Sequence, residues 1–136
     1  MCLFCKKFIF ILYYQRAINL ASKGEYLDAI RTLHNAPFKE IFFLYFLLAA
    51  FLYEGIGKFD ESLILYDKAR YLIYENEKLN QDEKQYLYKY INNSYIFIYE
   101  QQHKLSKADS VKKENSKIVF NIEKVNKNLQ NDFVMV

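Results

Sequence analysis

The sequence predicts an all-α fold, and three observations support that prediction. Its 136 residues contain one Pro and three Gly, too few for the turns that separate short strands. The good helix formers Leu, Ala, Lys, Glu and Gln are abundant. The segment GEYLDAI, which begins at Gly24, is echoed at an interval of about 33 residues by GKFDESL from Gly57. Because 52% of the residues are hydrophobic, the chain can bury a core, and we expect about six helices in antiparallel pairs.

Four helices are expected in the first half of the chain, where apolar residues recur at helical spacing. The predicted ranges are about 4–22, 25–35 and 38–55, followed by a helix that begins near Phe59. Residues that stop helices stand between these ranges. Gly24 suits the left-handed turn that ends the first helix, and Pro37 ends the second. Gly55 and Gly57 separate the third helix from the fourth.

The second half is expected to contain two helices after a polar connector, ENEKLNQDE. Asn80 followed by Glu83 is the pattern of a capping box, in which each side chain accepts a hydrogen bond from the backbone N–H of the other residue. A fifth helix is therefore predicted from there to about Gln102. A sixth helix, after HKLSK, is predicted to reach about Gln130. The last residues, 131–136, are expected to form a flexible tail.

The echo around Gly24 and Gly57 extends to matching positions on both sides of each glycine. A small residue stands seven residues before each glycine and another five residues after it. Ala stands twelve residues after the glycine. Large residues stand eleven residues before it and two and nine residues after it. The first unit has Tyr13, Ala17, Tyr26, Ala29, Leu33 and Ala36, and the second has Phe46, Ala50, Phe59, Ser62, Tyr66 and Ala69. A weaker third unit, aligned on His103, keeps Ala108 but has Ile96 at the small position.

This pattern resembles the tetratricopeptide repeat, a helix-turn-helix unit of about 34 residues. The resemblance implies a single domain over residues 1–136, folded as a short right-handed solenoid of stacked antiparallel helix pairs. Repeat 1 would cover about 10–42 and repeat 2 about 43–76. A degenerate third pair with an extended last helix would cover about 80–130 and cap the stack.

The resemblance also implies a non-catalytic scaffold for protein–protein interaction, in which the first helices of successive pairs line a concave groove. The implied groove residues are Tyr14, Ile18, Leu44, Leu47, Phe51, Tyr90, Asn93 and Phe97. These are mostly apolar, so the expected partner is a peptide or an amphipathic helix of another protein. Three alternatives remain: the last helix of this chain fills the groove, a second copy forms a homo-oligomer there, or the residues are simply core.

No catalytic or metal signature is present in the sequence. The two His residues, His34 and His103, have no Ser or Cys placed beside them, and no glycine-rich phosphate loop occurs, so neither an enzyme nor a cofactor is expected. Cys2 and Cys5 form a lone C-x-x-C without the second ligand pair that zinc requires. We interpret them as incidental thiols of a cytoplasmic protein, in a reducing compartment.

Membranes and nucleic acids are less favoured partners. The apolar stretch 41–53 would reach only about 20 Å as a helix, against about 30 Å of hydrocarbon. The apolar N-terminus, residues 8–14, keeps open the alternative of a membrane-associated protein anchored through its first helix. The net charge of +3 is spread among alternating Lys and Glu residues, so no nucleic-acid binding is expected.

Overall fold

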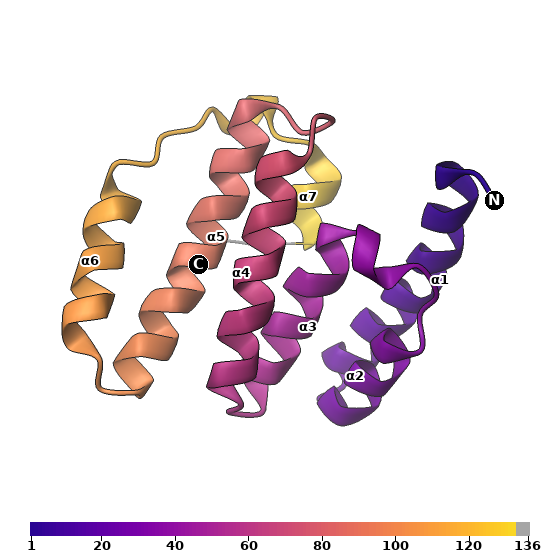
Figure 1. Cartoon of the computed structure of the whole chain (residues 1–136), viewed down its shortest axis with the longest axis horizontal. Coiled ribbons are helices and arrows are strands. Elements are labelled where there is room, and N and C mark those ends of the chain that lie inside the picture. The colour runs from indigo at the N-terminus through magenta and orange to yellow at the C-terminus, as the bar shows by residue number, and fades with distance from the viewer. Residues whose placement is uncertain (133–136) are drawn as a thin grey trace. The chain divides into compact units, whose positions relative to one another are not determined.

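The computed structural model describes residues 1–132, and this part of the chain is all-helical, as the sequence predicts (Figure 1). It holds seven α-helices and two short 3₁₀-helices, η1 and η2, and no strand between residues 1 and 132. The chain divides into two compact units, Met1–Leu72 and Ile73–Val136.

The first unit contains α1 (Leu3–Ser22), α2 (Tyr26–His34), η1 (Lys39–Ile41), α3 (Phe43–Gly55) and most of α4 (Phe59–Glu75). The predictions for the first, second and fourth helices are confirmed. Helix α2 packs against both α1 and α3. In Figure 1, α1 and α2 form one antiparallel pair and α3 and α4 a second.

Small buried residues let the helices of the first unit approach closely. Ala17, Ala29, Ala50, Ser62 and Ala69 are all fully buried. The hydroxyl of Ser62 in α4 donates a hydrogen bond of 2.7 Å to the carbonyl oxygen of Ala50 in α3. A larger side chain at either position would separate the two backbones.

The third helix begins at Phe43, five residues later than the predicted start at 38, so that part of the prediction is wrong. Phe38 adopts a left-handed conformation with φ of 62°, and η1 follows it. Aromatic contacts with α1 hold this connection. The ring of Phe42 stacks on that of Phe10 at 4.8 Å, and the Lys6 ammonium lies 5.4 Å from the centroid of the Phe38 ring. Packing of these rings therefore outweighs the helical pattern of the local sequence.

The described part of the second unit contains the end of α4, then α5 (Gln81–Gln101), α6 (Leu105–Ser116), η2 (Ile122–Lys124) and α7 (Lys127–Asp132). Helices α5 and α6 pack as an antiparallel pair (Figure 1). The predicted capping box is confirmed. The Asn80 side chain accepts from the Glu83 N–H at 2.8 Å, and the Glu83 carboxylate accepts from the Asn80 N–H at 3.0 Å.

The extended last helix predicted to reach about Gln130 is wrong, because α6 ends at Ser116. Two backbone N–H groups of the following segment bond to carboxylates at the start of α5. Asn121 donates to Asp82 at 2.8 Å, and Asn126 donates to Glu83 at 3.0 Å. These bonds fold the chain back along α5 and compete with helix continuation. Of the predicted flexible tail, residues 131 and 132 belong to α7, and 133–136 lie outside the described residues.

Three helix pairs share one type of turn, centred on Gly24, Gly57 and His103. These residues have φ of 79°, 79° and 58°. Each donates its N–H to the carbonyl oxygen three residues earlier, and the next residue donates to the carbonyl oxygen five residues earlier. The distances are 2.9 and 3.0 Å around Gly24, 3.0 and 2.9 Å around Gly57, and 3.1 and 2.8 Å around His103. The second bond is the one that defines a Schellman helix ending.

Exchanging the residue types of these turns tests the need for a left-handed backbone. Gly24→Ala and Gly57→Ala should each lower the free energy of unfolding by about 1 kcal/mol. An added Cβ meets no atom within 4 Å at either position, so the cost comes only from holding alanine at a positive φ. His103→Gly should raise the free energy of unfolding by about 0.5 kcal/mol. Glycine relieves the strain of the positive φ, but it also gives the unfolded chain more entropy, which offsets part of this gain. Urea unfolding followed by circular dichroism measures all three. Equal stability of Gly24→Ala and the wild type would show that the turn does not need a positive φ.

Candidate functional site

The predicted groove residues differ widely in accessibility. Tyr14 and Leu47 are 2% and 0% exposed and belong to the core of the first unit. Phe51 in the first unit and Phe97 in the second are 39% and 45% exposed. The other four, which are half-buried, are Ile18, Leu44, Tyr90 and Asn93. The two exposed aromatic residues are therefore the groove positions most open to a partner.

Two of these residues, Tyr14 and Asn93, contact a neighbouring side chain within their own unit. Tyr14 lies 5.8 Å from Phe10, one turn earlier in α1, as measured between ring centroids. Asn93 in α5 accepts a hydrogen bond of 3.0 Å from the amide nitrogen of Asn115 in α6. The first contact lies within α1, and the second joins α5 to α6. The arrangement of all eight residues as one groove stays a prediction.

Phe51 forms part of an accessible aromatic surface with Tyr26 of α2. The two rings meet edge to face with centroids 6.4 Å apart. The ring of Tyr26 also lies on Gly55, where an added Cβ would overlap it. Gly55, predicted only as a residue that stops the third helix, thus also lets the Tyr26 ring approach the end of α3. Phe51, Tyr26 and Gly55 together define what we call the Phe51 surface.

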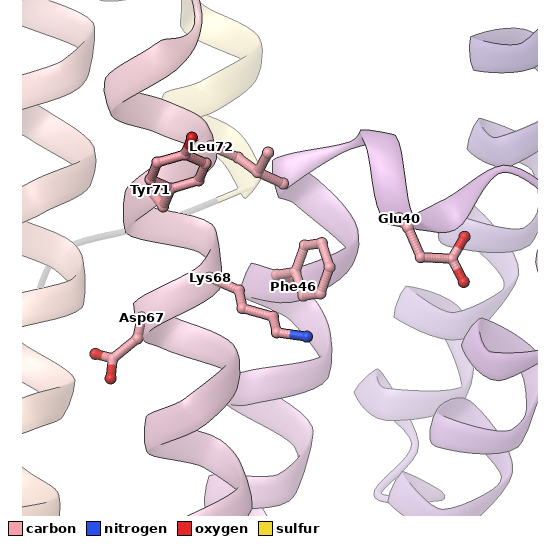
Figure 2. A pocket seen from close by; sticks show the side chains of 6 residues that line it. All are labelled: Glu40, Phe46, Asp67, Lys68, Tyr71 and Leu72. Carbon is pink, nitrogen blue, oxygen red and sulfur yellow. The ribbon is translucent and has the colours of Figure 1, made fainter.

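A pocket of about 390 Å³ opens elsewhere on the first unit, between α3, α4 and η1 (Figure 2). Its lining residues are Glu40, Phe46, Asp67, Lys68, Tyr71 and Leu72. Figure 2 shows Lys68 extending toward Phe46 and Asp67 pointing away from it, and the Lys68 ammonium lies 5.7 Å from the centroid of the Phe46 ring. An aromatic wall with a charged rim can accept an apolar side chain of a partner.

Glu40 forms part of the charged rim of this pocket. Its carboxylate lies 3.4 Å from the Lys39 ammonium. Backbone hydrogen bonding, and to a smaller extent Lys39, lowers the pKa of Glu40 below its usual 4.5, so the carboxylate is charged at neutral pH. The sequence did not predict the pocket, because its lining residues come from three elements and only Phe46 holds a repeat position.

His34, the last residue of α2, connects that helix to α3. Its Nε2 lies 3.0 Å from the Tyr53 hydroxyl, and its Nδ1 lies 3.2 Å from the Tyr45 hydroxyl. His34 is exposed as a residue, but its ring is partly buried. This burial lowers the pKa of His34 below 6.5, and the positive charge of Lys39 lowers it further by a smaller amount. The pattern of apolar positions in the sequence gave no sign of these two tyrosine partners.

Acidification should therefore weaken the first unit in a window just below pH 6.5. There the unfolded chain binds a proton at His34 before the folded chain does, so stability falls as the pH falls toward the folded-state pKa. Urea midpoints measured between about pH 7 and pH 5 should decrease in the wild type and change less in His34→Gln. The loss of stability from Glu40 is centred below pH 4.5, because its folded-state pKa is lower than 4.5, and this separates most of it from the effect of His34. A wild-type midpoint that rises over this window would contradict the prediction.

Neither a metal-ligand cluster nor a membrane-spanning helix occurs in the part of the chain that the structure describes. Residues 1–132 contain no group of three or more His, Cys, Asp or Glu side chains that could hold a metal ion. Within the same residues, each helix is either too short or too polar to cross a lipid bilayer. Comparison with protein-family models, with curated proteins and with solved structures gives no match to this chain.

Proposed function

We propose that this protein is a non-catalytic scaffold of the tetratricopeptide type that binds an amphipathic helix of another protein. The observation that carries the proposal is the turn that recurs at Gly24, Gly57 and His103 with the same pair of backbone hydrogen bonds. Five residues after each turn centre stands a small buried residue, Ala29, Ser62 or Ala108. Helix pairs closed by one recurring turn are the units from which repeat scaffolds are built.

The proposed contact in the first unit is the Phe51 surface, together with the half-buried predicted groove residues Ile18 and Leu44. Exposed aromatic rings at the centre of an interface supply much of its binding energy. Apolar residues of a partner helix, spaced three and four residues apart, would cover the Phe51 and Tyr26 rings. Leu47, fully buried one turn before Phe51, anchors α3 in the core, and Tyr14 of α1 belongs to the core of the same unit.

Capture of a binding partner from cell extract, followed by measurement of its affinity, tests the proposal. Phe51→Asp should weaken binding at least about tenfold, because a charge replaces the central apolar contact. Leu27→Asp is the matched control, since Leu27 is an exposed apolar residue of α2 outside the predicted groove. Tyr71→Asp tests the pocket in the same way.

The three variants distinguish the possible sites. Weaker binding only for Phe51→Asp supports the proposed surface. Weaker binding only for Tyr71→Asp moves the partner to the pocket and overturns the choice of surface. Equal binding by Phe51→Asp and the wild type, with the fold intact by circular dichroism, would exclude the Phe51 surface as the binding site.

A second candidate function is association with an anionic lipid surface through α1. Four apolar residues of this region, Met1, Phe4, Phe8 and Leu12, are each more than half exposed and recur at helical spacing. Residues 1–24 contain Lys and Arg but no Asp or Glu, which suits a negatively charged surface. Sedimentation with vesicles of phosphatidylserine should then depend on Phe8, and equal recovery of wild type and Phe8→Asp would exclude this function.

A further inference from the structure

Cys2 and Cys5 lie together at the N-terminus of α1, Cys2 just before its first turn and Cys5 within it. Cys2 is the N-cap: its carbonyl oxygen accepts the Lys6 N–H at 3.1 Å, and its Sγ accepts the Cys5 N–H at 3.3 Å. The two sulfur atoms lie 3.0 Å apart, within hydrogen-bond distance for thiols, and both residues are exposed. The pair is therefore accessible and already in contact.

The charges around this pair favour a thiolate at Cys2. Free N–H groups and the helix dipole stabilise a negative charge at a helix N-terminus. Lys6 and Lys7 follow directly, and the first acidic residue of the chain is Glu25. The hydrogen bond between the two thiols lowers the pKa of Cys2 and raises that of Cys5. Cys2 is thus suited to attack, and Cys5 to remain a thiol until a second step.

We propose that Cys2 and Cys5 form a thiol–disulfide exchange site that reacts with small disulfides of the glutathione type. In the first step the Cys2 thiolate attacks one sulfur of the disulfide RSSR, forming a mixed disulfide and releasing RS⁻. In the second step Cys5 loses its proton to solvent and attacks the Cys2 sulfur, which releases a second RS⁻. One RSSR is reduced to two thiols as the two cysteines are oxidised to one intramolecular disulfide.

The proposal is independent of the scaffold function. Neither cysteine belongs to the predicted groove, to the Phe51 surface or to the pocket, so failure of partner binding leaves it untouched. The sequence alone favoured incidental thiols, because a C-x-x-C without a recognisable strand and helix around it is a weak signal. The structure adds two observations that support a reactive pair: Cys2 is the N-cap of α1, and the two sulfur atoms are in contact.

The test treats the reduced full chain with oxidised glutathione, stops the reaction with acid at timed intervals, and measures intact mass and free thiols. The wild type should lose two hydrogen atoms and remain a monomer. Cys5→Ser should stop at one glutathione adduct on Cys2. Cys2→Ser should react at Cys5 at least about tenfold more slowly than Cys5→Ser reacts at Cys2.

A comparison with the unfolded chain shows whether the helix matters. The wild type in denaturing urea keeps the same cysteine spacing but loses the N-cap, so its disulfide should form at least about tenfold more slowly. Both substitutions place Ser at exposed positions, which should leave the fold intact by circular dichroism. Equal reactivity of the two cysteines, equal rates in the folded and unfolded chain, or disulfide-linked dimers as the main product would each overturn the proposal.

Discussion

Leu47→Asp should unfold the first unit, with a loss of unfolding free energy of more than about 4 kcal/mol. The side chain of Leu47 in α3 is fully buried, so an aspartate there would lose its water without gaining a partner. Because a whole domain is stable by only about 5–15 kcal/mol, this loss removes much of its stability. Urea unfolding monitored by circular dichroism measures the effect.

Phe51→Asp, one turn further along α3, is the matched control. Its side chain is already 39% exposed, and the change removes mainly the edge-to-face contact with Tyr26, worth about 1 kcal/mol. We therefore expect this variant to stay folded. A Leu47→Asp variant as stable as Phe51→Asp would place Leu47 at the surface. The comparison also shows why partner binding is best tested at Phe51, where a defect cannot be attributed to unfolding.

Glu83→Ala should destabilise the second unit by about 2–4 kcal/mol. Glu83 is 8% exposed, and its carboxylate accepts two backbone hydrogen bonds, from Asn80 at the start of α5 and from Asn126 near the start of α7. Alanine leaves both N–H groups without an acceptor. Amide hydrogen exchange at Asn80 and Asn126 should accelerate, while urea unfolding gives the loss of stability.

Two variants serve as controls for Glu83→Ala. Glu83→Gln keeps one side-chain oxygen as an acceptor, so we expect it to lose roughly half as much unfolding free energy as Glu83→Ala. Asp82→Asn keeps a side-chain oxygen for the Asn121 N–H and should cost less than about 1 kcal/mol. If amide exchange at Asn126 is equally slow in Glu83→Ala and the wild type, the carboxylate does not hold this segment.

Much of the fold was predictable because local signals decided it. The capping box of Asn80 and Glu83 and the left-handed glycines Gly24 and Gly57 are set by residues close in sequence. The two errors, the start of α3 and the end of α6, arise where distant residues compete with the local pattern. Stacking of Phe42 on Phe10 delays α3, and the bond from Asn126 to Glu83 redirects the chain after α6.

The candidate site was less predictable than the fold. The repeat pattern places Tyr14 and Leu47 on equivalent positions of their helices and Phe51 one turn after Leu47, but it does not fix how far each side chain is covered. At 3.6 residues per turn, one helix face holds both core and surface residues, and only packing separates Leu47 from Phe51. The pocket was not predicted at all, since Phe46, Lys68 and Glu40 come together only through tertiary structure.

The bond between Asn126 and Glu83 also bears on the order in which the second unit assembles. It joins residues 43 positions apart, whereas the turn at His103 closes the pair α5 and α6 through neighbouring residues. Closing a long loop costs more chain entropy than closing a short one. The hairpin of α5 and α6 should therefore form first and the segment 121–126 should dock last. The same segment should open first under native conditions, as a separate cooperative unit.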